Sequence, residues 1–138
     1  MKKHDFPRTE CLKSSKLFRK VILEGHSVFQ HPLKLHFMIT YLDKPASVSL
    51  LLAGFSISKR KHPKATTRNL LKRRMKEAFR LNKELAKETI ATFPNYHLDL
   101  VVIYQVGEIC NYKQIEQALI KCLQKLKNQL CSFEMNTI

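Results

Sequence analysis

The chain has 138 residues, of which 44% are hydrophobic; this predicts one globular domain with a real core and excludes a disordered chain. Lys and Arg outnumber Asp and Glu by 25 to 11, so the net charge of +14 favours a polyanionic partner. No apolar run approaches the ~18 residues of a membrane helix, and the N-terminus lacks the apolar segment of a signal peptide. We therefore expect a cytoplasmic protein with no membrane partner.

The N-terminal part of the chain predicts a basic arm followed by a helix. Residues 1–13 are expected to form the extended arm. Ser14 or Ser15 can cap a first helix, because either hydroxyl can accept a hydrogen bond from the first turn. Gly25 is placed to end that helix.

Alternation of apolar and polar residues predicts a short strand and then two longer ones. In residues 33–41 the odd-numbered positions are apolar, so one face of this strand is expected to join the core. Residues 43–45 are expected to turn, and residues 47–58 to run back as the partner strand. The hairpin leaves a semi-polar face that includes His36 and Ser56, although the sequence does not fix its register.

Most of the charge lies in residues 59–87, which contain twelve Lys and Arg but only two acids, Glu77 and Glu84. This stretch carries +10 of the net +14. A solvated helix face is the ordinary interpretation of such a run. The acids that would pair with these cations at i, i+4 are nearly absent, however, which favours a nucleic-acid backbone as the partner.

From Thr67 onward the same stretch has the period of a helix. The apolar side is expected to comprise Leu71, Met75, Ala78, Leu81 and Leu85, with Leu70 and Phe79 at its edges. The cationic side is expected to comprise Arg68, Lys72, Lys76 and Arg80, widened by Asn69, Arg73, Lys83 and Lys87. Arg74 falls inside the apolar arc, so we expect its stem to cover apolar surface and its charge to reach solvent.

The C-terminal part predicts one more strand and one more helix. Pro94 and Asn95 are expected to break the chain, and residues 98–106 form a nearly continuous apolar run typical of a central strand covered on both faces. Asn111 with Gln114 resembles the capping box of a last helix. The predicted architecture is an α+β, single-domain two-layer sandwich with the order helix-strand-strand-strand-helix-strand-helix on a small mixed sheet. The domain is expected to cover residues 1–130, with a frayed tail over 131–138.

The sequence contains no motif of a catalytic or metal centre. The four cysteines lack C-x-x-C spacing, the six histidines are scattered, and no Gly-rich phosphate loop or paired-carboxylate motif occurs. We therefore expect buried or free thiols, and neither a zinc site, nor a disulfide framework, nor catalytic residues in the protein.

Residues 54–81, GFSISKRKHPKATTRNLLKRRMKEAFRL, resemble the protein subunit of bacterial ribonuclease P. That family has a strand ending in Ser and two basic residues, then a loop, then R-N-R-x-K-R-x-x-R-E-A-F. The matching residues are Gly54, Ser58, Lys59, Arg60, Arg68, Asn69, Lys72, Arg73, Glu77, Ala78 and Phe79. Residues 12–28 resemble the family's first helix, and the likeness as a whole runs from about Arg8 to Leu126. The chain departs from the pattern at Leu70 and Lys76, where the family has Arg, whose planar fork neither residue supplies.

The resemblance implies a fold like ribosomal protein S5 domain 2, with a left-handed crossover between parallel strands. It also implies a ribonucleoprotein enzyme that removes the 5′ leader of precursor tRNA to give the mature 5′ end. The implied partners are the catalytic RNA subunit and precursor tRNA, the cofactor is Mg²⁺ held mainly by the RNA, and no protein partner is predicted. The implied RNA-binding residues are Lys59, Arg60, Lys61, Lys64, Arg68, Asn69, Lys72, Arg73, Lys76 and Arg80. The implied cleft for the single-stranded leader contains Phe18, at the family's leader-contacting aromatic, with Lys16, His36 and Ser56.

Other interpretations remain open at this point. Helical periodicity alone allows Phe18 to be a core residue, and the charges from Lys59 to Lys61 can simply terminate a strand with soluble groups. Composition also fits a structural RNA-binding protein of the ribosomal type, with no enzyme attached. A DNA-binding regulator would need a helix-turn-helix spacing that the sequence does not show.

Overall fold

The computed structural model describes residues 11–12, 14–42, 51–92 and 95–137, with the backbone alone for 133–137. The elements are α1 (Ser15–Glu24), β1 (His26–Gln30), β2 (Leu33–Tyr41), β3 (Leu51–Ile57), α2 (Ala65–Ala91), β4 (Tyr96–Tyr104) and α3 (Tyr112–Thr137). The predicted order of α+β elements is confirmed. Most of the predicted arm, the turn at 43–45 and the break at Pro94 lie outside the described residues.

The four strands form one mixed sheet in the order β1-β2-β4-β3. β4 lies at the centre, antiparallel to β2 and parallel to β3, so the predicted hairpin between 33–41 and 47–58 is wrong. The physical reason is the apolar run of β4, which is buried on both faces and therefore pairs along both of its edges. α2 connects the parallel strands β3 and β4, and the predicted crossover is this connection.

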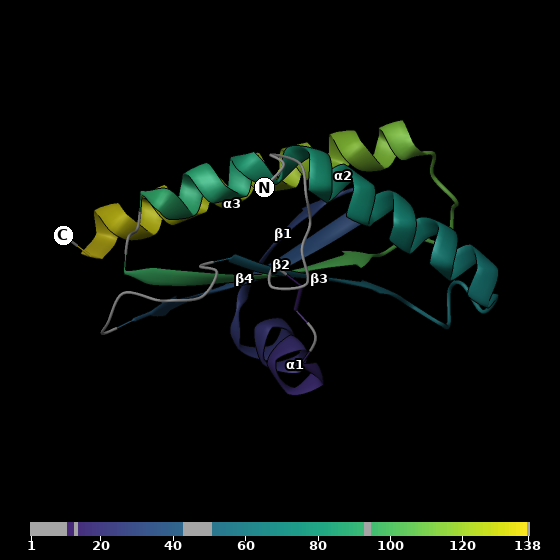
Figure 1. Cartoon of the computed structure of the whole chain (residues 1–138), viewed down its shortest axis with the longest axis horizontal. Helices are drawn as coiled ribbons and strands as arrows, with labels where there is room; N and C mark the ends of the chain where they lie inside the picture. Colours follow the sequence, from purple (N-terminus) through teal and green to yellow (C-terminus); the bar gives the residue numbers. More distant parts are fainter. Residues whose placement is uncertain (1–10, 13, 43–50, 93–94, 138) are drawn as a thin grey trace.

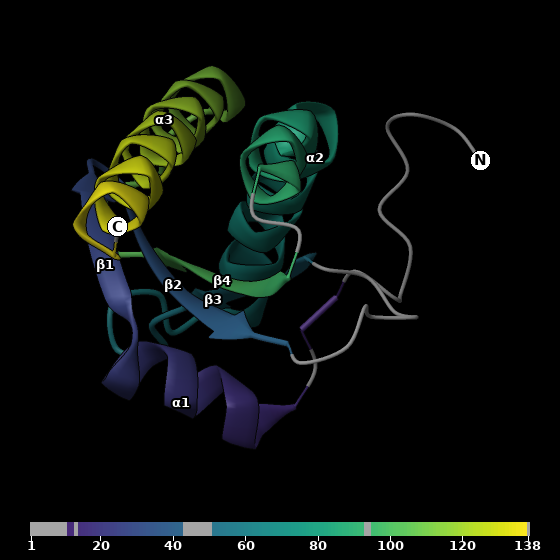
Figure 2. The same cartoon turned by 90° about the vertical axis from the view of Figure 1, so that its left-hand side faces the viewer.

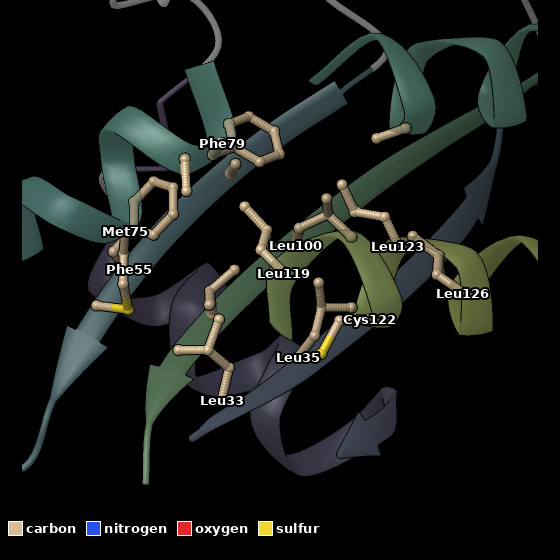
Figure 3. Packing of buried hydrophobic residues seen from close by; sticks show 14 of the residues in the cluster. Leu33, Leu35, Phe55, Met75, Phe79, Leu100, Leu119, Cys122, Leu123 and Leu126 are labelled. Carbon is tan, nitrogen blue, oxygen red and sulfur yellow. The ribbon is translucent and has the colours of Figure 1, made fainter. Parts of the chain in front are cut away.

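α2 and α3 lie side by side on one face of the sheet, and α1 covers part of the other face (Figures 1 and 2). The larger core lies between the sheet and the α2–α3 layer, where Figure 3 shows side chains of strands and helices pointing into one space. The alternation in β2 is confirmed, because Leu33, Leu35 and Phe37 are fully buried in this core. The two predicted layers are thus present, and α1 adds a helix beneath the sheet.

α1 begins and ends as its sequence predicts. The Ser14 side chain accepts a hydrogen bond from the Leu17 backbone N–H at 3.2 Å, and Gly25 is the C-cap. Gly25 has a φ of −84°, so its backbone is not left-handed. It is needed for close approach, because a Cβ there would lie 2.4 Å from the Phe37 carbonyl oxygen.

α3 starts with the predicted capping box. The Asn111 N–H donates to Gln114 Oε1 and the Gln114 N–H donates to Asn111 Oδ1, both at 2.9 Å. The structure continues α3 through Thr137, beyond the domain boundary expected at residue 130. Fraying of this last part in solution stays a prediction. No helix in the described ranges is long and apolar enough to cross a membrane.

The buried face of α2 differs from the predicted one. Leu81 and Leu85 are each 37% exposed, whereas Phe79, expected at an edge, is 1% exposed. Lys83, expected on the cationic side, is buried with 2% exposure. The reason is that α2 packs on both β3 and α3, so its buried side follows two contacts. Toward β3 the rings of Phe55 and Phe79 meet edge to face, with their centroids 5.8 Å apart.

Candidate nucleic-acid interface

A cleft of about 620 Å³ opens beside the β3 edge of the sheet. α1, β3 and α2 all contribute to its wall. It is lined by Cys11, Leu12, Ser15, Phe18, Arg19, Ile22, Leu23, Ala53, Gly54, Phe55, Ser56, Lys72 and Lys76. We call this hollow the α1–β3 cleft. It brings together two of the predicted leader-cleft residues, Phe18 and Ser56, with two residues of the cationic side of α2.

Phe18 is both a packing residue and a wall of the α1–β3 cleft. Its half-buried ring packs against a small cluster of Leu12, Val21 and Val101 on the α1 side of the sheet. The ring also lies over Gly54, where a Cβ would come within 2.7 Å of its Cε2 atom. Gly54 therefore lets the aromatic ring settle against the edge strand. The core and cleft interpretations of Phe18 describe two sides of one ring.

The other two predicted cleft residues do not line the α1–β3 cleft. Lys16 is an exposed residue of α1, and His36 is only 8% exposed on β2. His36 lies opposite Val101 in the sheet register, two strands away from Gly54. Burial, and then the nearby charge of Lys34, lower the pKa of His36 below its usual value of 6.5. A contact of either residue with the leader stays a prediction.

A second hollow, which we call the α2 groove, has a volume of about 450 Å³. It is lined by Asn69, Lys72, Arg73, Lys76, Glu77 and Arg80. Arg80 donates from Nη2 to Glu77 Oε1 at 2.6 Å and from Nε to Glu77 Oε2 at 3.0 Å. This hydrogen bonding lowers the pKa of the Glu77 carboxyl. Lys72 and Lys76 line both hollows, so we call these two residues the shared ridge.

The basic loop, residues 58–64, is fastened to the connection between β4 and α3. Lys61 Nζ donates to the Gln105 carbonyl. His62, 4% exposed, has its Nε2 at 2.7 Å from the Val106 carbonyl oxygen. Since a carbonyl oxygen can only accept, this ring nitrogen carries the proton.

Arg68 and Arg74 also have structural partners. Arg68 Nη1 donates to the carbonyls of His62 and Pro63 at 2.9 and 2.7 Å. Arg74 is half-buried and its Nη1 donates to the Cys110 carbonyl at 2.6 Å, a partner that the sequence did not predict. The helix wheel could not show this, because the acceptor lies on a distant loop.

Of the ten predicted RNA-binding residues, the structure leaves most at the surface. Lys61, Arg68 and Arg80 have the protein partners described above. The exposed residues are Lys59, Arg60, Lys61, Lys64, Asn69, Lys72, Arg73 and Lys76. Sequence reasoning missed Arg19 in the α1–β3 cleft, although its spacing from Ser15 and Ile22 follows one helix face. It also missed His62, for which the sequence gives no signal.

Within the described part of the chain, no three His, Cys, Asp or Glu side chains come together as a metal site. In the described residues Cys11, Cys110, Cys122 and Cys131 form no disulfide bond, and burial raises the pKa of the Cys122 thiol to about 11. The chemistry that this surface offers is cationic and aromatic, which suits the phosphates and bases of a nucleic acid.

Comparisons with known proteins identify the family. The family model described as Ribonuclease P matches residues 6–127. The ribonuclease P protein component of Clostridioides difficile (strain 630) is 36% identical over 116 residues, covering 83% of this chain and 90% of that protein. That of Dictyoglomus turgidum (strain DSM 6724 / Z-1310) is 30% identical over 123 residues, covering 87% and 91%.

Solved structures agree with this assignment. The RNase P protein from Thermotoga maritima superposes with a TM-score of 0.58 at 26% identity, covering 84% of this chain and 96% of that one. The RNase P protein from Staphylococcus aureus has the same fold, with a TM-score of 0.62 at 22% identity and coverage of 88% and 92%. The chain therefore belongs to the ribonuclease P protein family, as the protein subunit of an endoribonuclease that processes the 5′ ends of tRNAs.

Proposed function

We propose that the α1–β3 cleft holds the single-stranded 5′ leader of precursor tRNA, while the α2 groove and the basic loop bind the catalytic RNA subunit. The observation that carries this assignment is the shared ridge. Lys72 and Lys76 line both hollows, so the same two ammonium groups can lie between the two RNAs. In this arrangement the protein binds both polyanions at once and lowers the repulsion between them.

The chemistry of the two hollows fits these two roles. The α1–β3 cleft offers the Phe18 ring for stacking and Arg19 for a phosphate, a combination that accepts unpaired bases of any sequence. The α2 groove offers Lys and Arg without an aromatic ring, which suits contacts with a phosphate backbone. Neither hollow needs to read bases, as is suitable for leaders of many sequences.

We assign phosphodiester hydrolysis to Mg²⁺ held mainly by the RNA subunit. The shared ridge and Arg73 offer only cationic groups, which compete with Mg²⁺ rather than ligate it. Their expected contribution is indirect. By neutralising phosphates of both RNAs, they lower the Mg²⁺ concentration at which the complex assembles and cleaves.

The test is reconstitution with a bacterial ribonuclease P RNA, followed by precursor-tRNA cleavage at low Mg²⁺. We expect the protein to support cleavage there, whereas rigorously RNA-free protein cleaves nothing. Replacing both ridge residues, Lys72→Ala with Lys76→Ala, should weaken binding of the RNA subunit and of precursor tRNA. Arg73 lines the α2 groove but not the α1–β3 cleft, so Arg73→Ala should weaken binding of the RNA subunit and leave binding of precursor tRNA unchanged. The assignment is wrong if the ridge variant discriminates precursor from mature tRNA as well as the unmodified protein does.

A further inference from the structure

Arg68 turns back from the first turn of α2 onto the chain that precedes the helix. Its Nη1 donates to the carbonyl of His62 at 2.9 Å and to that of Pro63 at 2.7 Å. The side chain is half-buried, whereas the next residues, Asn69 and Leu70, are exposed. Arg68 lines neither the α1–β3 cleft nor the α2 groove. Its guanidinium is therefore tied to the protein, although the helix period predicts it among the outward-facing cations of α2.

The acceptors of these bonds lie where the basic loop joins α2. Lys64, the N-cap of the helix, makes no side-chain capping bond. Its carbonyl accepts the backbone N–H of Arg68 at 3.1 Å, so Arg68 bonds to the three consecutive carbonyls of residues 62–64. Because both the backbone and the side chain of Arg68 take part, these bonds fix the direction in which the basic loop enters the helix.

The bonds of Arg68 also change the surface that a polyanion meets. A carbonyl oxygen carries partial negative charge and can only accept hydrogen bonds, so a carbonyl without a donor repels a phosphate. Pro63 is exposed, and so are Lys61 and Lys64 on either side of this part of the loop. Arg68 thus supplies the donor for an exposed acceptor that lies among cations of the basic loop.

Arg73 provides the contrast within the same helix. It is exposed and lines the α2 groove, where a phosphate can reach its guanidinium. Arg68, only five residues earlier, bonds instead to the loop. Two arginines of one basic helix therefore have different surroundings, which indicates different roles toward the same partner.

We propose that Arg68 is a positioning residue for the RNA subunit: by holding the carbonyls of residues 62–64, it directs Arg60 and Lys64 of the basic loop toward the phosphate backbone. This inference rests on the proposed binding of the RNA subunit by the basic loop and the α2 groove. Direct contact of the Arg68 guanidinium with a phosphate is the competing role, because its other nitrogens can also donate. The bonds to the loop, and the position of Arg68 outside the lining of both hollows, favour positioning.

The experiment is a double-mutant cycle on the affinity of the protein for a bacterial ribonuclease P RNA. Arg68→Ala should weaken binding about tenfold, because the loop loses a charged donor. Arg60→Ala should weaken binding in the unmodified protein but have little further effect once Arg68 is replaced, since the loop no longer directs Arg60 to its phosphate. In the matched cycle, the losses of Arg73→Ala and Arg60→Ala should add, because Arg73 acts from the α2 groove.

The salt dependence of the same affinities gives a second readout. Arg73→Ala should reduce the log–log slope by about 1, the loss of one phosphate contact. Arg68→Ala should reduce it by about 2, because the contacts of Arg60 and Lys64 are lost together. A residue that binds one phosphate by itself cannot produce the larger change.

Thr89→Ala is the control for a loss of helix stability alone. Thr89 is buried near the other end of α2, where its hydroxyl donates to the Leu85 carbonyl at 2.8 Å. This variant should have a lower melting temperature and an unchanged affinity of the folded protein for the RNA. Arg68→Met, which keeps the aliphatic stem but removes the donors, repeats the cycle if Arg68→Ala folds poorly.

The positioning role is supported if the effect of Arg60→Ala disappears in the Arg68 variants but persists beside Arg73→Ala. If the losses of Arg68→Ala and Arg60→Ala add, and the slope changes by about 1, Arg68 is a phosphate contact and the inference is wrong. An equal loss of affinity in Thr89→Ala would also overturn it, because helix stability would then explain the effect. If Arg60→Ala and Arg73→Ala both bind the RNA subunit normally, the proposed function itself fails, and the inference with it.

Discussion

The two faces of the sheet are built for different tasks. On the α2–α3 side, buried apolar residues form a continuous core from Val28 to Leu130. On the α1 side only Leu12, Val21 and Val101 are buried apolar residues of the described cluster, and partly buried side chains surround them. One face therefore supplies most of the stability, so the other can keep the Phe18 ring, Gly54 beneath it and the α1–β3 cleft available for binding.

The largest expected effect tests that division of stability. Leu100 and Leu52 lie on adjacent strands, Leu100 in the larger core and Leu52 half-buried on the α1 side. Leu100→Ala should lower the free energy of unfolding by about 3 kcal/mol, because it leaves a cavity in a closed core. Leu52→Ala should cost about 1 kcal/mol. Urea unfolding measures the free energy of unfolding of both variants. Equal losses would show that the two faces of the sheet contribute equally to stability.

The next prediction concerns binding on the α1 side. Phe18→Ala should weaken the binding of precursor tRNA to the holoenzyme by about 1–3 kcal/mol and leave the binding of mature tRNA unchanged. The reason is that only the precursor has a leader whose bases can stack on the ring. Holoenzyme titrations with both tRNAs measure the difference, and circular dichroism checks the fold. If the variant unfolds, Phe18 acts as a core residue. If the variant binds both tRNAs more weakly by the same factor, the assignment of the leader to the α1–β3 cleft is wrong.

A smaller effect separates cations within the α2 groove. Arg73 is exposed, whereas Arg80 already pairs with Glu77. For about five phosphate contacts, the log–log dependence of RNA-subunit affinity on salt should have a slope of roughly −3.5 to −4.5. Arg73→Ala should reduce the slope by about 1, and Arg80→Ala by less. Glu77→Gln should strengthen binding, because it releases Arg80; weaker binding in this variant would contradict the pairing argument.

The smallest expected effect is a pH dependence of stability. The folded pKa of His36 lies below 6.5, so the unfolded chain takes up this proton first and stability falls as the pH drops through 6.5. His36→Gln removes this contribution. Its melting temperature should therefore fall less than that of the unmodified protein between about pH 7.5 and about pH 5.5. If the melting temperatures of the two proteins fall equally over this pH range, burial does not lower the pKa of His36 as argued.

Local signals in the sequence predicted local structure well. Ser14, Gly25 and the Asn111–Gln114 pair have the roles that their residue types favour, because caps depend on near neighbours in the chain. The strand partners were not predictable in this way. Pairing of β3 with β4 depends on which strand is buried on both faces, and the short turn predicted at residues 43–45 falsely favoured a hairpin.

The site was predictable as a set of charges but not as a geometry. The helix period placed Lys72, Arg73 and Lys76 on one exposed side, as the structure has them. It also placed Lys83 there, because a helical wheel assumes one buried direction and cannot know how α2 rests on β3. That the shared ridge lines two hollows depends on the distance between α1 and α2, which no local pattern contains.

The fastening of the basic loop has a consequence for the thermodynamics of RNA binding. Lys61 and His62 donate to the carbonyls of Gln105 and Val106, so the backbone before α2 is held by the connection between β4 and α3. Its conformational entropy is lost during folding rather than on binding, which preorganises Lys59 and Arg60 for the partner. Amide hydrogen exchange at His62, whose N–H donates to the Ser58 carbonyl, should therefore be slow in the free protein and change little in the complex. In a destabilised β4–α3 connection, the same loop would have to order itself at each encounter, and association would slow even though no residue that touches RNA had changed.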